Sequence, residues 1–287
     1  MSRTVTIQSS ELSLEISTFG AEILSLRDKN GREYIWEGDP AIWGRRAPVL
    51  FPICGGLADG KYILNDRKYK LDKHGFAKKL DFKLESQSKS RAVFLLTECE
   101  ETLISYPFRF ELRAIFELSN TKLTVTYDVK NNSDTTMYYS CGGHEAYALP
   151  EGIDGCQVIF DKAETLNNYK VEQGILSTHF ETILENSHAL VLSKNHFESD
   201  ALIFKELASR SVTLVNSTGD RRIRVDFDGF DHLLLWQVSG AKYLCIEPWT
   251  GLPDIIGTDG DFSHKESTSS LESGASAAYT HHITILD

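Results

Sequence analysis

The stretch FRFELRAIFELSNTKLTVTYDV, from Phe108 to Val129, decides the fold class of this chain. Apolar residues alternate with polar ones in two runs, Phe108–Leu112 and Leu123–Val129. Successive side chains of a strand point to opposite faces, so a period of two predicts strands with one buried face. The two runs are separated by Ser119-Asn120-Thr121-Lys122, a sequence typical of a turn. The stretch therefore predicts an antiparallel β-hairpin.

The same alternation extends in both directions from this hairpin. It recurs in Leu12–Ile16, in Tyr62–Leu64 and Tyr69–Leu71 joined across Asn65-Asp66, in Ile223–Phe227 and in Tyr279–Ile285. Helical spacing is confined to Glu101–Tyr106, which could form one helical turn before Pro107. We expect the Ser-rich segment Ser263–Ser276 to be a surface loop that precedes a closing strand.

Turns recur at the intervals of a large antiparallel sandwich, and no Pro- or Ser-rich linker divides the chain. We therefore predict an all-β fold in which residues 1–287 form a single domain, one large antiparallel β-sandwich. The length of 287 residues is compatible with this prediction. All-β domains often reach roughly 200 to 250 residues as one unit.

The charge balance disfavours two classes of partner. The chain has 30 Lys and Arg residues against 41 Asp and Glu residues, a formal net charge of −11. Nucleic acids and anionic membranes are bound by clustered cations, so neither is an expected partner. The longest apolar runs, such as Ala47–Cys54, are far shorter than the roughly 20 residues that span a bilayer. The N-terminus lacks the features of a secretory signal, so we expect a cytoplasmic protein.

Metal and cofactor chemistry is not indicated by any motif. The chain has no glycine-rich nucleotide loop, no nucleophile elbow and no H-E-x-x-H helix, and the spacing of its histidines suggests no metal site. Five cysteines without a C-x-x-C pair form neither a disulfide framework nor a zinc ribbon. We therefore expect no metal, no cofactor and reduced, mostly buried thiols.

Polar residues in apolar or glycine-rich contexts mark the candidate site, because a charge in such a context is costly unless it is paired or used. Glu247 is the most informative of them. It follows the apolar run Tyr243–Ile246 and precedes Pro248, which ends ladder pairing, so its carboxylate is expected at a strand end facing a cleft. The other four places are Arg45-Arg46 before Ala47–Pro52, His74-Gly75-Phe76-Ala77, Gly142-Gly143-His144-Glu145-Ala146-Tyr147 and Asp200–Phe204.

Together with Tyr106-Pro107-Phe108, these motifs resemble the ordered motifs of the aldose 1-epimerase (galactose mutarotase) family, and most closely its bacterial epimerase-related branch. The resemblance extends from about residue 5 to the C-terminus. It implies the galactose mutarotase-like supersandwich, which agrees with the period-two strand pattern described above. It also implies an isomerase that interconverts the α and β anomers of a sugar, a small-molecule substrate, without a cofactor.

The resemblance further implies roles for single residues. Glu247 matches the general base of the family, His144 the general acid and His74 a second histidine at the ring oxygen. Asp200 matches a ligand of a sugar hydroxyl, and Arg45 and Arg46 occupy the region of the substrate-binding arginine. From their residue types, we expect Trp249 or Tyr147 to offer the sugar an apolar face.

Two departures from the family pattern leave alternatives open. Lys78-Lys79 stands where relatives often have arginine, so Arg45, Arg46 and Lys78 could hold a phosphate, and both a hexose and a hexose phosphate remain candidate substrates. Glu145 stands where proline is common. It could raise the pKa of His144 or point to solvent, and strand alternation favours the face opposite His144.

Two other functions are consistent with the predicted fold. A non-catalytic carbohydrate-binding or sugar-sensing protein would keep the pocket without turnover, and the intact acid and base disfavour it. A polysaccharide lyase would require an extended basic cleft, and the chain has no obvious basic tract. The mutarotase is therefore the leading hypothesis.

Overall fold

The predicted hairpin is confirmed in the computed structural model, which describes residues 3–287. β8 (Phe110–Ser119) and β9 (Lys122–Asn131) pair antiparallel, with Phe116 opposite Val125. Asn120 adopts a positive φ of 52° in the connecting turn, a conformation that asparagine tolerates better than most residues. The strand begins at Phe110, so Phe108 lies just before it although its side chain is buried.

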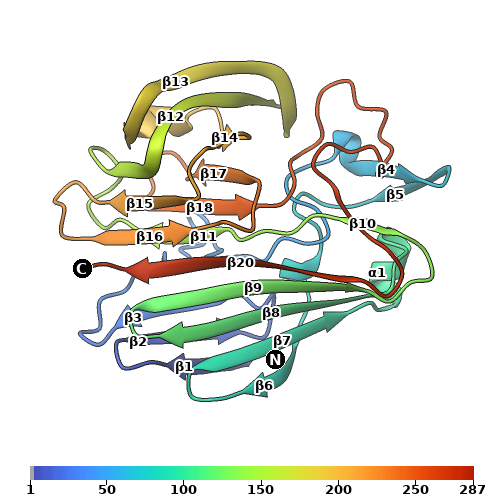
Figure 1. Cartoon of the computed structure of the whole chain (residues 1–287), viewed down its shortest axis with the longest axis horizontal. Helices are drawn as coiled ribbons and strands as arrows, with labels where there is room; N and C mark the ends of the chain where they lie inside the picture. The colour runs from blue at the N-terminus through green and yellow to red at the C-terminus, as the bar shows by residue number, and fades with distance from the viewer. Residues whose placement is uncertain (1–2) are drawn as a thin grey trace.

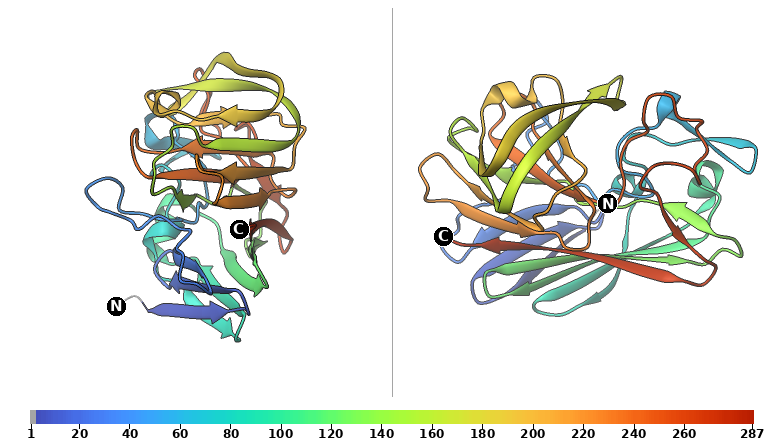
Figure 2. Two further views of the ribbon diagram at one scale, coloured as in Figure 1. Left: turned by 90° about the vertical axis from the view of Figure 1, so that its left-hand side faces the viewer. Right: turned by 45° about the horizontal axis from the view of Figure 1, so that its top comes forward.

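This hairpin belongs to a nine-stranded antiparallel sheet that extends across the whole molecule (Figure 1). The β12–β13 hairpin lies at one end of the molecule and β6 and β7 lie near the other (Figures 1 and 2). In spatial order its strands are β13 (Ile175–Val191), β12 (Gln157–Glu172), β15 (Ser211–Val215), β16 (Arg222–Asp226), β20 (Ser276–Ile285), β9, β8, β7 (Arg91–Thr97) and β6 (Lys83–Gln87).

Four smaller sheets complete the fold. Their strands are β11 (Glu145–Ala148), β18 (Tyr243–Trp249), β17 (His232–Trp236) and β14 (Leu202–Phe204) in the four-stranded sheet, β1 (Thr4–Gln8), β2 (Leu12–Ser17) and β3 (Ile23–Asp28) in the three-stranded sheet, and the pairs β4 (Lys61–Leu64) with β5 (Arg67–Lys70) and β10 (Met137–Tyr139) with β19 (Ser269–Leu271). The Ser-rich segment is therefore not entirely a loop, because β19 lies inside it and pairs with β10.

Helices are short, as the sequence predicts. The expected helical turn before Pro107 is α1 (Glu100–Ser105), and three 3-10 turns lie at η1 (Ala58–Gly60), η2 (Ala77–Lys79) and η3 (Lys194–Phe197). None of the helices within residues 3–287 has the length and apolar character needed to cross a bilayer. The thiols are mostly buried, as expected: Cys54, Cys141, Cys156 and Cys245 are buried and Cys99 is exposed.

The main core lies between the nine-stranded sheet and the smaller sheets. Phe116 of β8, Val125 of β9 and Ile283 of β20 belong to the same buried cluster as Leu244 and Ile246 of β18. Alternate residues of β18 thus face this core. The intervening residues face the opposite side of the four-stranded sheet, where the candidate site lies.

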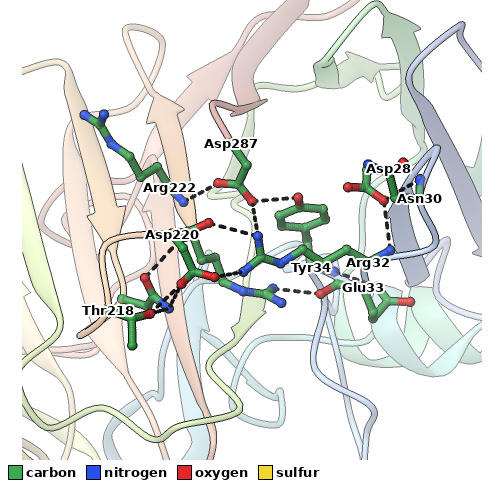
Figure 3. Close-up of polar contacts among 11 residues, drawn as sticks. Asp28, Asn30, Arg32, Glu33, Tyr34, Thr218, Asp220, Arg222 and Asp287 are labelled. Atoms are coloured by element: carbon green, nitrogen blue, oxygen red, sulfur yellow. Dashed lines mark hydrogen bonds and ion pairs between the residues drawn. The ribbon is translucent and has the colours of Figure 1, made fainter.

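A polar network ties the end of the chain to two loops (Figure 3). The Asp287 carboxylate accepts hydrogen bonds from Tyr34 Oη at 2.7 Å and Arg32 Nη1 at 3.0 Å. It also accepts one from the Arg222 backbone N–H at 2.5 Å, and Arg32 pairs with Asp220 at 3.0 Å. The loop after β3 is therefore fastened to β16 and to the segment after β20.

Replacing Asp287 by alanine is expected to lower the free energy of unfolding by about 1–3 kcal/mol, because the fully buried Tyr34 loses the acceptor of its hydroxyl. Urea denaturation measures this loss. The exposed Asp134, for which no ion pair is present in the described chain, is the matched control, and D134A should change stability by no more than about 0.5 kcal/mol. Equal effects of the two substitutions would contradict a stabilising role for the network.

Candidate functional site

Glu247 lies in β18 on the face turned away from the main core. Leu244 and Ile246 pack into that core, so the alternation of the strand places Cys245, Glu247 and Trp249 on the opposite face. Glu247 is only 1% exposed, and it pairs in register with Leu234 of β17. The carboxylate is therefore deeply buried, two residues before the end of β18.

His144 is held beside Glu247 by the two glycines that precede it. Gly143 N–H donates to Pro248 O at 3.1 Å, and Trp249 Nε1 donates to Gly143 O at 3.1 Å. A Cβ on Gly142 would lie 2.5 Å from Trp249 Cδ1, so only glycine permits this backbone approach. As a result His144 Nε2 lies 3.3 Å from Glu247 Oε2. The pair lacks the alignment of a hydrogen bond, and such contacts tighten when substrate binds.

His74 lies in a loop with a constrained backbone and approaches the His144–Glu247 pair. Its φ is +67°, and a Cβ on the following Gly75 would lie 2.2 Å from Phe51 O. Gly55 N–H donates to His74 Nδ1 at 3.0 Å, so the proton of the neutral ring is on Nε2. The ring centroid lies 5.5 Å from that of His144 and 5.3 Å from that of Trp249. His74 therefore offers an N–H donor next to the pair.

These groups line a cavity of about 350 Å³. Aromatic rings form much of its wall: Trp43 stacks on His144 at 5.1 Å between centroids, and Trp236 meets the same ring edge-on at 5.5 Å. The lining consists of Trp43, Arg45, Pro48, Lys73, His74, Lys78, His144, Asp200, Ala201, Leu234, Trp236, Val238, Glu247 and Trp249. A small number of polar groups among apolar and aromatic side chains is typical of a small-molecule site.

The cationic side chains that line the cavity differ in how far they already pair with other groups of the protein. Arg45 Nη1 pairs with the buried Glu22 at 2.9 Å and donates to Lys78 O at 3.1 Å. Lys78 Nζ donates to Lys73 O at 2.8 Å, and burial next to other cations lowers the pKa of Lys78 to about 8. Arg45 is therefore largely neutralised by its own partner.

Burial sets the protonation of the central pair. It raises the pKa of Glu247 well above its usual range, and the neighbouring Glu145 and Asp200 add to the effect while Lys73 opposes it. It also lowers the pKa of His144 to about 3 and that of His74 well below its usual value, and nearby lysines contribute to both shifts. Both imidazoles are therefore neutral at neutral pH, and burial favours the protonated form of the Glu247 carboxyl.

A metal is poorly suited to this donor set. His144, Cys245 and Glu247 have donor atoms within 4.8 Å of one another. Burial raises the pKa of the Cys245 thiol and of the Glu247 carboxyl well above their usual values, whereas a metal ligand must be deprotonated. The chemistry of these three groups therefore favours proton transfer over metal binding.

Two predicted site residues do not line the cavity. Tyr147 is fully buried in the main core, because it is three positions from His144 in an extended segment and so points to the opposite face. Arg46 turns away from its neighbour Arg45 and donates through Nη1 to Leu24 O at 2.6 Å. The predictions that Tyr147 and Arg46 contact a substrate in this cavity are therefore corrected, whereas Arg45, His74, Lys78, His144, Asp200, Glu247 and Trp249 all line it.

Sequence reasoning missed six residues of this region: Trp43, Lys73, Leu234, Trp236 and Val238, which line the cavity, and Glu22, which pairs with Arg45. Lys73 and Trp43 lie within two residues of predicted site residues, so their proximity was a usable signal. Trp236 ends the apolar run Leu233–Trp236 and looks like a core residue in the sequence. Glu22 has no local pattern, and only the fold brings it to Arg45.

Glu145 forms a second buried pair on the core face. His281 Nε2 lies 3.0 Å from Glu145 Oε1, which links β20 of the large sheet to β11 of the four-stranded sheet. His281 is 0% and Glu145 1% exposed. The predicted orientation of Glu145 away from His144 is confirmed, but its carboxyl is buried rather than solvated, and it pairs with His281.

Comparison with known proteins gives consistent results. A model described as "Aldose 1-epimerase" matches residues 3–269. The chain is 34% identical over 263 residues to the chromosomal protein LacX of Lactococcus lactis subsp. lactis, covering 87% of this chain and 88% of that one.

Solved structures agree with this match. A galactose mutarotase related enzyme from Lactobacillus acidophilus superposes with a TM-score of 0.94 at 32% identity, covering 99% of this chain and 98% of that one. A galactose mutarotase-like protein from Lactobacillus casei superposes with a TM-score of 0.95 at 27% identity, covering 99% and 100% of the two chains. The fold is therefore a galactose mutarotase-like β-sandwich.

Replacing His281 by alanine is expected to lower the free energy of unfolding by about 3–5 kcal/mol, because it leaves the buried Glu145 carboxyl without its partner. The adjacent His282 is the matched control. It points to the other face of β20 and is only partly buried, so H282A should cost about 1 kcal/mol or less. Chemical denaturation of both variants measures the difference, and equal losses would contradict the assigned pairing.

The protonation of the imidazoles can be observed by ¹⁵N NMR. Between about pH 5 and 8, His74 and His144 should remain neutral, with the His74 proton on Nε2. The exposed His264, whose pKa Asp259 raises, should titrate in the same spectra. Below about pH 6.5 the unfolded chain binds protons on His74 and His144 that the folded chain does not, so these rings should reduce stability as the pH falls. Titration of His144 near its usual pKa would contradict the described environment.

Proposed function

Because the chain belongs to the aldose 1-epimerase family, we propose that it is an isomerase that interconverts the α and β anomers of a hexose by acid–base ring opening. One observation carries the proposal: the 3.3 Å approach of His144 to Glu247 inside a cavity of about 350 Å³. An acid and a base at this separation can reach the two oxygens of one pyranose hemiacetal, the C1 hydroxyl and the ring oxygen.

In the proposed reaction Glu247 removes the proton of the C1 hydroxyl while His144 donates a proton to the ring oxygen. The electron pair of the broken O–H bond forms the C1 carbonyl, and the bond between C1 and the ring oxygen breaks. Rotation about the C1–C2 bond exposes the other face of the aldehyde, and ring closure reverses both proton transfers. Each positioned acid or base typically contributes roughly 10²- to 10⁴-fold in rate.

The reaction requires an ionised Glu247 and a protonated His144, whereas burial favours the neutral form of each. The two states differ only in the position of one proton, which crosses between Glu247 Oε2 and His144 Nε2. A bound sugar would donate hydroxyl hydrogen bonds to Glu247, and Lys73 already favours its charged form. We propose that substrate binding moves the proton to His144, so that the two groups titrate as a coupled pair.

The surrounding residues hold the sugar in this proposal. His74 donates its Nε2–H toward the ring oxygen, and Asp200 accepts a hydrogen bond from a ring hydroxyl. Trp249, edge-on to His74, offers an apolar face to the C–H groups of the sugar. Each of these side chains acts through a hydrogen bond or packing, which leaves proton transfer to His144 and Glu247.

We propose a free hexose rather than a hexose phosphate as the substrate. A pair of arginines could grip a phosphate by bidentate hydrogen bonds. Arg45 is instead neutralised by Glu22, and Arg46 is bound to Leu24 O. The remaining cations, Lys73 and Lys78, are point charges, and Asp200 lines the same cavity.

Replacing Glu247 by glutamine is expected to reduce kcat for anomer exchange by roughly 10²- to 10⁴-fold, because the amide keeps the shape of the side chain but cannot accept the proton. Polarimetry or NMR of freshly dissolved α-glucose and α-galactose measures the exchange. Glu37→Gln, an exposed glutamate that does not line this cavity, is the control and should retain full activity. If the wild type binds a sugar but does not accelerate exchange, the protein is instead a non-catalytic sugar-binding protein.

The same anomer-exchange assay tests whether the substrate is a free or a phosphorylated hexose. We expect glucose or galactose to have a kcat/KM about tenfold or more above that of glucose 6-phosphate, because the cavity lacks a free guanidinium fork for the phosphate. A preference for the phosphate that is lost in Lys78→Gln would contradict this and would place the phosphate at Lys78.

A further inference from the structure

A separate cavity of about 440 Å³ shares none of its described lining residues with the proposed active site. Its walls come from the segment 33–37 after β3, from Ala148 at the end of β11 and from Pro150. Arg221, directly before β16, and Lys242, directly before β18, complete the lining. This space, the Arg221 cavity, takes no part in the ring opening proposed above.

Arg221 is a buried cation that pairs with no carboxylate of residues 3–287. Its side chain belongs to a residue that is 5% exposed. Nη1 donates to Glu33 O at 2.7 Å, and the guanidinium carbon lies 4.9 Å from the centroid of the Tyr34 ring. A carbonyl oxygen and an aromatic face stabilise a guanidinium but do not neutralise it. Because Nε has no acceptor in the described chain, the group keeps both its charge and N–H capacity for an anion.

Two acidic side chains close to Arg221 in the fold are already held by other groups. Asp220, the preceding residue, pairs with Arg32 at 3.0 Å. The Asp287 carboxylate accepts from Tyr34 Oη at 2.7 Å and from Arg32 Nη1 at 3.0 Å (Figure 3). The network at the end of the chain therefore uses these two acids and leaves the charge of Arg221 unmatched.

The charges that line the Arg221 cavity favour a monoanion. They belong to Glu33, Glu37, Arg221 and Lys242. Glu33 Oε2 pairs with Arg27 Nε at 3.1 Å, so that charge is offset outside the cavity. Glu37 and Lys242 are exposed, and neither forms an ion pair within the part of the chain that the structure describes. Two positive charges and one negative charge remain, which suits a single negative charge better than a dianion.

The remaining wall of the cavity is apolar. Ile35, Trp36, Ala148 and Pro150 provide it. Small-molecule sites typically combine apolar and aromatic walls with a few polar groups that fix the orientation of the ligand. A ligand that fits this cavity therefore carries one anionic end and an apolar body. The planar fork of a guanidinium matches the geometry of a carboxylate, which has a single charge at neutral pH.

We propose that the Arg221 cavity binds a small organic carboxylate. The carboxylate group lies between Arg221 and Lys242, and an apolar ring or chain packs against Trp36 and Pro150. This inference is independent of the proposed function, because the two cavities have separate linings.

Two tryptophans report which cavity a ligand occupies. Trp36 lines the Arg221 cavity, and its Nε1 donates to Trp43 O at 2.9 Å. Trp249 lines the proposed active site, and its Nε1 donates to Gly143 O at 3.1 Å. A ligand in the Arg221 cavity should therefore shift the indole N–H resonance of Trp36 in a ¹H–¹⁵N spectrum and leave that of Trp249 in place.

The test titrates the full chain at constant ionic strength with benzoate, benzamide, acetate and inorganic phosphate. We expect benzoate to shift the Trp36 resonance with a Kd about tenfold or more below the Kd of each other probe, because benzamide lacks the charge, acetate the apolar body and phosphate the single charge. No shift of Trp36 by benzoate, or a shift of Trp249 instead, would overturn the proposed site. Equal affinity for benzamide would refute the role of the charge, and equal or tighter binding of phosphate would refute the carboxylate class.

Three substitutions test the location. Lys242→Glu reverses an exposed charge at the cavity, and Lys89→Glu makes the same change on an exposed lysine that does not line it. We expect K242E to raise the Kd for benzoate about tenfold or more and K89E to leave it within about twofold. Arg221→Gln should abolish the shift of Trp36, and K242E provides the same test if this buried substitution prevents folding. Equal Kd values for K242E and K89E would overturn the assignment.

Discussion

The close passage of Gly142 and Gly143 along Pro248 and Trp249 is the constraint on which the site depends. One backbone hydrogen bond, one hydrogen bond from the Trp249 side chain and the absence of a Cβ at Gly142 bring these two glycines against β18. His144 is the next residue and therefore reaches Glu247. A larger residue in place of Gly142 would separate the acid from the base without changing either, so the geometry of the pair is set by its backbone.

The segment Gly142–Glu145 also joins the two layers of the sandwich. His144 faces the cavity, and the next residue, Glu145, faces the core, where it meets His281 of the large sheet. The pairs His144–Glu247 and His281–Glu145 thus lie on opposite faces of the four-stranded sheet. Only His144–Glu247 can reach a ligand. Burying such groups costs stability, and in the described chain each pair keeps unpartnered atoms: Glu247 Oε2 and His144 Nδ1 in one pair, and Glu145 Oε2 and His281 Nδ1 in the other.

Much of the fold followed from the sequence because strands with one buried face have a period of two. β8, β9 and β20 are long enough for that pattern to be unambiguous. β19 was missed because three residues, two of them serine, carry no readable period. Within the site, motif order pointed to the pair and His74. Tyr147 and Arg46 lie outside the cavity, because alternation turns Tyr147 to the core face and Arg46 is bound to Leu24 O. Glu22 could not have been predicted, since its contact with Arg45 exists only in the folded chain.

We propose that the buried His144–Glu247 pair opens a sugar ring by transferring one proton at each of the two oxygens of the hemiacetal. The most direct test is the pH dependence of kcat/KM for wild-type anomer exchange on glucose and galactose. We expect exchange that is proportional to protein concentration, with a bell-shaped profile whose two apparent pKa values belong to the coupled pair. A rate no faster than the buffer at every pH, with sugar bound, would contradict it.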